Sequence, residues 1–375
     1  MIIIIKIGIF LLNIIYWFIK LLPTQHKVVM ISRQSNVPSK EFEMLEEEIC
    51  QRDPGTKVVL LCRTLDGGVD STTFTKLKYV FHMFVQMYHI ATAKVVILDS
   101  YCIVISILHH KKSLKVIQMW HSMGTMKMFG YTSLDTAEGS SSKLAHAMKM
   151  HQNYDYVFAS AEAYKDHLAS GFNCAREKIL TMPLPRLDLL KNPEYERDIR
   201  KNIFEKYPEL MKKPVIMYCP TFRKDETQFE KAVYNLVKAV DTEKYNLVVK
   251  LHPLSKVALD DKVVQAKEFS SFDMLFVADY VISDYSCIVY EAAVRNIPLY
   301  FYNFDMELYT DGRGLAIDYV KELPGLISKN AEEIVSSIEQ ESYDMEELKR
   351  FSDKYVVPVN NATKNIVDFI WNFMG

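Results

Sequence analysis

His121 is the first of two histidines that stand where they could do acid–base chemistry. It follows the apolar segment 115–119, and Gly124 and Gly130 come shortly after it. A ligand can approach a loop histidine beside glycines closely, because glycine carries no side chain. The ordinary histidine pKa lies near 6.5, so this group could take a proton from an alcohol at neutral pH. The alternative is a structural histidine that hydrogen-bonds a nearby backbone group.

The second histidine, His252, directly follows the strand-like segment 246–251 and precedes Pro253. Proline restricts the turn past the strand, so we expect the imidazole at the carboxyl edge of a sheet. From that position it could stabilise negative charge on a leaving phosphate. Capping of the loop is the alternative role.

Two further motifs carry groups that suit a phosphate ligand. Arg223 ends the segment 218–223, just past a strand-like run, and its paired N–H donors could clamp a phosphate. A surface arginine is the alternative. The segment 283–286 (Ser-Asp-Tyr-Ser) leads into a helical run, where its residues could cap the helix or bind an anion. We expect Asp284 to orient a neighbour or contact sugar hydroxyls, because its charge would repel a phosphate.

Short runs of valine, isoleucine and leucine alternate with helical patterns along the whole chain. The expected strands are 27–32, 57–62, 94–98, 115–119, 155–159, 179–182, 215–219, 246–251, 280–283 and 298–302. The expected helices are 39–50, 76–92, 193–213, 226–241, 286–295 and 362–374. This alternation is typical of parallel sheets that are covered on both faces. A length of 375 residues favours two such α/β domains.

The N-terminal segment 1–22 is almost wholly apolar and ends at Pro23. Lys6, Asn13 and Lys20 repeat every seven residues and fall near one face of a helix. This pattern predicts a helix that lies in the membrane interface. A transmembrane span is the second interpretation, since about 20 apolar residues suffice to cross a bilayer. A buried core helix is the third.

Composition excludes several classes of function. The net charge of −2 leaves no global basic field for nucleic acid. Six cysteines without a C-x-x-C pair favour free thiols in a reducing compartment over a structural zinc site. The sequence contains no G-x-G-x-x-G, P-loop, G-x-S-x-G or H-E-x-x-H motif. It also contains no paired acids at metal-ligand spacing. We therefore expect no metal and no cofactor.

Six motifs, in this order, resemble the CDP-glycerol glycerophosphotransferase family of teichoic acid synthesis. They are W-H-S-M-G-x-x-K-x-x-G (120–130), M-P-L-P-R-L-D (182–188), Y-C-P-T-F-R (218–223), L-H-P (251–253), S-D-Y-S-x-x-x-Y-E-A (283–292) and a closing motif (309–315) with Asp318. The resemblance covers approximately residues 27–357. Each motif alone is weak, but six in order are specific.

The resemblance implies a GT-B architecture, in which two Rossmann-like domains with parallel sheets face each other across a cleft. The expected parts are a membrane-associated helix (1–23), an acceptor domain (24–192), a linker (193–213), a CDP-alditol-binding domain (214–358) and a C-terminal helix that packs back (359–375). Members of the family move an alditol phosphate from a CDP-alditol to a hydroxyl of a lipid-linked acceptor and release CMP. They work at the cytoplasmic face of the membrane.

The resemblance also implies a role for individual residues. His121 would be the general base on the acceptor hydroxyl, and His252 would offset charge on the CMP leaving group. Arg223, Ser283 and Ser286 would hold the diphosphate together with His252. The donor pocket would be lined or ordered by Asp284, Glu291, Arg313 and Asp318. The other expected substrate-binding residues are Trp120, Ser122, Gly124, Lys127, Arg186, Thr221 and Pro253. Charge neutralisation by these protein groups would make a metal dispensable.

The family often has glycine or alanine where Ser122 stands, which is a mild departure. The long polymerases of the family carry an additional N-terminal domain. In its length and in the form of its first motif, this chain resembles the primase branch. Primases add the first glycerol phosphate to an undecaprenyl-diphosphate disaccharide. We therefore expect CDP-glycerol, a lipid-linked glycan and the membrane surface as partners. The alternatives are a CDP-ribitol enzyme, a polymerase or capsule enzyme, a nucleotide-sugar GT-B glycosyltransferase, and a non-catalytic scaffold that binds lipid-linked glycan.

Overall fold

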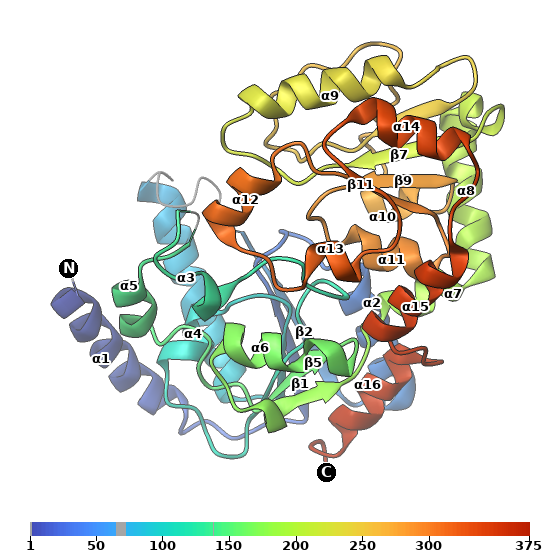
Figure 1. Cartoon of the computed structure of the whole chain (residues 1–375). Helices are drawn as coiled ribbons and strands as arrows, with labels where there is room; N and C mark the ends of the chain where they lie inside the picture. Colours follow the sequence, from blue (N-terminus) through green and yellow to red (C-terminus); the bar gives the residue numbers. More distant parts are fainter. Residues whose placement is uncertain (1, 65–72, 138) are drawn as a thin grey trace. The chain divides into compact units, whose positions relative to one another are not determined.

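The structure is a computed structural model that describes residues 2–64, 73–137 and 139–375 (Figure 1). The chain divides into two compact units. The first comprises Met1–Ser122, Phe129–Asp188 and Val359–Gly375, and the second comprises Met123–Met128 and Leu189–Pro358. The sequence did not indicate that residues 123–128 would join the second unit, nor that the expected linker 193–213 would lie within it.

The first unit is built on a parallel sheet of six strands in the order β2-β1-β3-β4-β5-β6. Its strands are β1 (Lys27–Ser32), β2 (Lys57–Cys62), β3 (Val95–Leu98), β4 (Lys115–Gln118), β5 (Tyr156–Ala159) and β6 (Ile179–Thr181). Its helices are α1 (Ile2–Ile19), α2 (Lys40–Arg52), α3 (Thr73–Ala91), α4 (Ile103–Ile107), α5 (Ser142–Ala147), α6 (Lys165–Phe172) and α16 (Ala362–Trp371). Helix α7 (Arg186–Lys191) lies at the boundary between the units.

Helices α2 and α16 pack together in the core of this first unit, although they lie at opposite ends of its sequence. Phe42 and Leu45 from α2 meet Ile366 and Ile370 from α16 among the buried strand residues. Asp188 caps α16, because its carboxylate accepts hydrogen bonds from the backbone N–H groups of residues 362 and 363. The end of the chain is thereby joined to the first unit.

The second unit contains a parallel sheet of five strands in the order β11-β10-β9-β7-β8. Its strands are β7 (Val215–Cys219), β8 (Asn246–Val249), β9 (Tyr280–Ser283), β10 (Leu299–Tyr302) and β11 (Ile327–Ser328). Its helices are α8 (Pro193–Lys206), α9 (Thr227–Ala239), α10 (Ser271–Met274), α11 (Ile288–Val294), α12 (Met306–Arg313), α13 (Tyr319–Glu322), α14 (Ala331–Glu339) and α15 (Met345–Tyr355). Helices α9 and α14 pack together against the sheet, and α11 packs on α15 (Figure 1).

Burial explains why the strands were recognisable in the sequence. The side chains of β1 and β3 are buried along their whole length. A strand covered on both faces has no solvent-facing positions, so it appears as an unbroken apolar run. Each strand expected from the sequence is present, with ends that agree to within two residues.

Helix α1 is present as expected, and it exposes most of its apolar side chains. It is long and apolar enough to cross a membrane. Its polar edge is nevertheless attached to the first unit. The amide of Asn13 donates to the carbonyl of Ile107 and its oxygen accepts from the backbone of His109. The Tyr16 hydroxyl lies 2.9 Å from His110 Nδ1, and Lys20 donates to the His109 carbonyl.

Candidate active site

His121 lies at the carboxyl edge of the first sheet, just past β4. Its Nδ1 is 2.9 Å from the backbone carbonyl oxygen of Asp99, which follows β3. A carbonyl only accepts hydrogen bonds, so in the neutral imidazole Nδ1 carries the proton and Nε2 carries the lone pair. Burial lowers the pKa of His121, the bond to the Asp99 carbonyl raises it, and the positive charge of Arg186 lowers it further. The net shift is downward, which keeps Nε2 able to accept a proton at neutral pH.

The backbone at Trp120 turns the chain sharply so that His121 reaches the neighbouring strand. Trp120 has a φ of 67°, in the left-handed region that bulky residues rarely adopt. Its N–H donates to the side chain of Gln118, and its ring packs on Phe129 and Phe172. These contacts hold a conformation that would otherwise be unfavourable. Trp120 is therefore a residue that positions His121 in the structure.

Arg186 belongs to the surroundings of His121 in the first unit. Its guanidinium forms an ion pair with Glu41, whose side chain is buried near the start of α2. The Gln34 side-chain amide lies 3.4 Å from His121 Nδ1. Glu41, Gln34 and Asp99 were not among the expected site residues. Asp99 follows β3, which pairs with β4, whereas Gln34 follows β1 and Glu41 lies in α2. All three are distant from His121 in the sequence, so no local pattern connected them with it.

The chain passes into the second unit between Ser122 and Met123. Gly124 is buried there, and Lys127 Nζ lies 3.3 Å from the hydroxyl of Thr221 and 5.9 Å from the ring centre of Tyr309. The backbones of Lys127 and Leu315 form an antiparallel bridge. Two expected site residues, Lys127 and Thr221, are thus brought together with the segment that begins the closing motif.

Arg223 has different neighbours from those expected of a phosphate clamp. Its Nε donates to Asp305 at 2.6 Å, and one terminal nitrogen donates to both Asp284 at 2.9 Å and Asp305 at 3.0 Å. The other terminal nitrogen donates to the Thr221 carbonyl at 2.7 Å. The guanidinium is buried, and four of its five N–H groups donate to these acceptors. Because buried carboxylates and a carbonyl take most of its donors, the geometry favours a positioning role.

Asp284 occupies the centre of this network and is completely buried. Its carboxylate accepts from the backbone N–H of Thr221 at 2.8 Å as well as from Arg223. The backbone carbonyl of Asp284 accepts from the Tyr319 hydroxyl at 2.7 Å. In the structure Asp284 thus holds Thr221 and Arg223, and its role toward a ligand stays a prediction. Asp305 and Tyr319 were missed, because no local pattern distinguishes either residue.

The remaining hydroxyl and carboxyl candidates lie at different depths. Ser283 is completely buried, and its hydroxyl donates to the Cys219 carbonyl at 2.8 Å. That bond gives Ser283 a structural partner in place of the expected diphosphate contact. Ser286 is half-buried, and Glu291 is buried within α11. Asp318 is exposed and pairs with Lys321, while the side chain of Arg313 lies outside the described part of the chain.

His252 and Pro253 are exposed at the carboxyl edge of the second sheet, just past β8. His252 Nδ1 lies 3.2 Å from the backbone nitrogen of Leu254, and its ring packs 5.1 Å from that of Phe222. Because Nδ1 accepts a hydrogen bond, the neutral imidazole carries its proton on Nε2. His252 therefore offers a donor, whereas His121 offers an acceptor.

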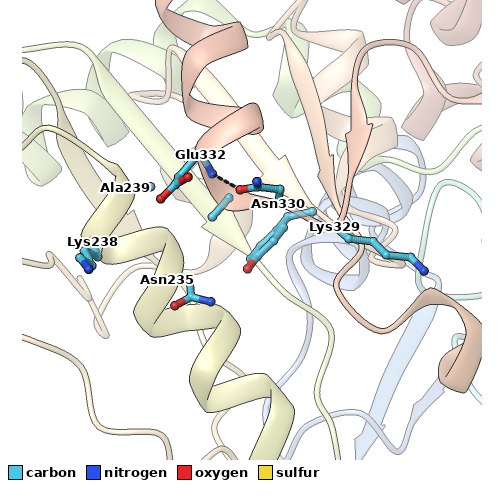
Figure 2. Close-up of a pocket in the computed structure, with 8 residues that line it drawn as sticks. Asn235, Lys238, Ala239, Lys329, Asn330 and Glu332 are labelled. Carbon is cyan, nitrogen blue, oxygen red and sulfur yellow. Dashed lines mark hydrogen bonds between the residues drawn. The ribbon is translucent and has the colours of Figure 1, made fainter.

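A separate pocket in the second unit has a volume of about 460 Å³ and is lined by residues of α9, β10 and the start of α14 (Figure 2). Asn330 caps α14 there through the N–H of Glu332. None of the expected site residues lines this pocket. In the part of the chain that the structure describes, no three His, Cys, Asp or Glu side chains are grouped to hold a metal ion.

Comparison with known families gives one match across nearly the whole chain. Residues 14–372 match the CDP-Glycerol:Poly(glycerophosphate) glycerophosphotransferase family. The teichoic acid ribitol-phosphate primase of Bacillus spizizenii is 31% identical over 94% of this chain and 93% of its own length. The teichoic acid glycerol-phosphate primase of Bacillus subtilis is 28% identical over 80% of this chain and 78% of its own.

A longer relative and a solved structure extend this comparison. The teichoic acid poly(ribitol-phosphate) polymerase of Bacillus spizizenii is 26% identical over 97% of this chain, which spans 59% of that protein. The structure of the wall teichoic acid polymerase TagF superposes with a TM-score of 0.73, at 20% identity, over 96% of this chain and 92% of that one. The structural likeness shows that the fold is the GT-B type expected from the sequence.

Proposed function

We propose a reaction for this chain, which belongs to the CDP-glycerol:poly(glycerophosphate) glycerophosphotransferase family. It transfers glycerol phosphate from CDP-glycerol to a hydroxyl of a lipid-linked glycan and releases CMP. The observation that carries the proposal is the opposite hydrogen bonding of the two loop histidines. The contact of its Nδ1 leaves His121 Nε2 as an acceptor, and the contact of its Nδ1 leaves His252 Nε2 as a donor. Phosphoryl transfer to an alcohol needs one group of each kind.

His121 acts on the acceptor. The acceptor oxygen attacks the phosphorus of the glycerol phosphate group and forms a new P–O bond, while the hydroxyl proton passes to His121 Nε2. The Asp99 carbonyl fixes the tautomer and stabilises the imidazolium that results. Burial, which lowers the pKa of His121, keeps the imidazole neutral before the reaction. The ion pair between Glu41 and Arg186 lies near this imidazole, and its two charges act on the His121 pKa in opposite directions.

His252 acts on the donor. The bond between the transferred phosphorus and the bridging oxygen breaks, and CMP leaves with the additional negative charge. A hydrogen bond from His252 Nε2–H to a diphosphate oxygen offsets that charge. Thr221 and Lys127 lie together in the same unit and supply a hydroxyl and a cation for the diphosphate. Arg223 and Asp284 position Thr221 through its backbone.

We assign the protein to the priming type, because the alignments with both primases cover most of each chain. CDP-ribitol is the second candidate donor. The observation that favours it is the 31% identity to a protein named teichoic acid ribitol-phosphate primase. A direct comparison of CDP-glycerol and CDP-ribitol as substrates distinguishes the two donors.

The location follows from α1. Its apolar side chains are exposed, while its polar edge is bonded to the first unit. We propose that the helix lies on the cytoplasmic face of the membrane with its apolar side among the lipids, as a peripheral anchor. An acceptor linked to a polyprenyl diphosphate would lie in the same membrane.

The test is a measurement of CMP release and acceptor mass with purified protein. The reaction contains CDP-glycerol and a disaccharide-diphosphate acceptor with a soluble tail. One added glycerol-phosphate unit per acceptor supports the proposal, and a ladder of units would instead show a polymerase. Reaction with CDP-ribitol alone would replace the donor, and reaction with a UDP-sugar alone would overturn the phosphotransferase assignment.

A further inference from the structure

Helix α3 exposes an apolar face that no partner within the protein covers in the described structure. The exposed fractions are 65% for Leu77, 71% for Phe81 and 40% for Tyr88, and Val80 and Phe84 are also exposed. These residues recur every three or four positions and therefore share one side of the helix. Surface helices normally place polar residues on that side.

This face adjoins the surface already described on α1. Helix α1 packs beside α3 and α5 in the first unit (Figure 1). On α1, Ile3 and Ile4 are each 73% exposed, and Phe10 is 64% exposed. On α5, Leu144 is also exposed. Three neighbouring helices of one unit thus present large apolar side chains to their surroundings. We name the exposed residues 77, 80, 81, 84 and 88 the α3 face.

The side chains of α1, of α3 and of the loop that holds α1 include basic residues and no acidic ones. The segments 2–22, 73–92 and 105–115, which contain α1, α3 and the loop that holds α1, have no aspartate or glutamate. They carry lysines at positions 6, 20, 76, 78, 111, 112 and 115. An apolar surface bordered by lysine suits a bilayer that contains anionic lipid. It does not suit a water-exposed surface of the same area.

We propose that the α3 face is a second lipid-contacting element, which inserts beside α1 into an anionic bilayer surface. The proposal rests on the membrane location proposed above and extends it to a second helix of the same unit. Two helices that insert together fix the orientation of the first unit on the membrane, whereas a single helix leaves rotation about its own axis free.

Helix α3 also lies close to the proposed base. The guanidinium of Arg33 is 5.8 Å from the ring centre of Tyr79 on α3, and the next residue, Gln34, reaches His121. Contact of the α3 face with lipid would therefore hold the carboxyl edge that carries His121 near the membrane surface. A membrane-anchored acceptor would present its hydroxyl near that surface.

The experiment is vesicle co-sedimentation of the full chain. The vesicles contain phosphatidylglycerol and phosphatidylcholine, and pure phosphatidylcholine vesicles serve for comparison. The variants are L77E/F81E on α3, I4E/F10E on α1, and M211E/Y234E as a matched control. Met211 is 65% exposed and Tyr234 is 67% exposed, both in the second unit, so this double variant also adds two negative charges and removes two large apolar side chains. Thermal unfolding checks that each variant is folded.

We expect L77E/F81E to lower the partition coefficient on anionic vesicles about ten- to hundredfold, because two large apolar side chains no longer insert. M211E/Y234E should bind as the wild type does. Unchanged binding of L77E/F81E, with a loss for I4E/F10E, would overturn the α3 proposal and leave the α1 anchor intact. Failure of the wild type to bind any vesicle would overturn both.

A second measurement does not depend on a loss of binding. Phe81→Trp should gain fluorescence quenching by brominated lipid relative to the wild type, and Tyr234→Trp should not. Absence of additional quenching in F81W would contradict insertion of α3. If L77E/F81E instead converts a dimer to a monomer in light scattering, without an effect on vesicles, the α3 face is a contact between copies of the protein.

Discussion

His121 Nδ1 lies 2.9 Å from the backbone carbonyl oxygen of Asp99. This contact selects one tautomer of the imidazole, because a carbonyl oxygen has no proton to donate. It leaves Nε2 as the nitrogen that can take a proton. The partner is a backbone atom, so no side-chain substitution at position 99 removes it. The geometry of the proposed base is therefore fixed by the main chain at the end of β3.

Replacement of His121 by alanine should lower turnover strongly without weakening the binding of CDP-glycerol. General-base catalysis contributes roughly 10²- to 10⁴-fold, so we expect CMP release to fall by that factor. The affinity for CDP-glycerol, measured by calorimetry, should be unchanged, because the donor residues lie in the second unit. His146→Ala, at an exposed histidine of the same unit, is the control and should react as the wild type does. Equal rates for H121A and H146A would remove His121 from catalysis.

The pH dependence of the reaction should reflect the lowered pKa of His121. Burial is the main cause of that shift, and it favours the neutral imidazole. The neutral form then persists below pH 6.5, and activity is lost only as the pH falls through the lowered value. We expect the acid limb of the kcat/KM profile below pH 6.5. An acid limb above pH 7 would show that another group controls the rate.

Replacement of Arg223 by glutamine should destabilise the second unit strongly. Asp284 and Asp305 would remain buried without a cation, and breaking such a pair costs about 3–5 kcal/mol. Urea unfolding measures this difference. The control is Arg197→Gln, which removes an exposed ion pair and should change stability by less than about 1 kcal/mol. Weaker donor binding by folded R223Q, without the stability loss, would instead favour a direct phosphate contact.

His252→Ala should lower the rate because the leaving group loses a hydrogen-bond donor. Loss of one such donor typically costs about 10²–10³ in kcat. His252→Gln can place an N–H near the position of Nε2 and should recover part of the rate. Leu254→Ala, at an exposed neighbour in the same loop, controls for loop structure. Equal activity of H252A and L254A would exclude His252 from the reaction.

Asp188→Ala should destabilise the first unit by about 1–2 kcal/mol, the usual effect of removing a helix cap. Asp188 accepts from the backbone of residues 362 and 363 and from the Thr363 hydroxyl, so the loss acts on α16. A lowered thermal midpoint with unchanged CDP-glycerol affinity is expected. An effect on affinity without an effect on the midpoint would place Asp188 in the donor site.

Much of the fold was predictable because the strands are buried on both faces, and this leaves continuous apolar runs in the sequence. β11 was missed, because a strand of two residues has no pattern. The positions of His121 and His252 at strand ends were also predictable. The partners of Arg223 were not, since Asp305 lies 82 residues away and only folding brings the two together. For the same reason, the sequence suggested a phosphate clamp where the structure has a buried ion-pair network.

The attachment of α1 to the first unit has a consequence for any shortened form of this protein. Tyr16 is buried against His110, and Asn13 satisfies backbone groups of residues 107 and 109. Removing residues 1–22 would delete the side chains proposed to contact lipid and would also uncover these groups of the first unit. A loss of activity after truncation would then combine lost anchoring with local unfolding. Exchange of exposed side chains such as Ile4 and Phe10 for polar ones separates the two effects, since the polar edge of the helix stays in place.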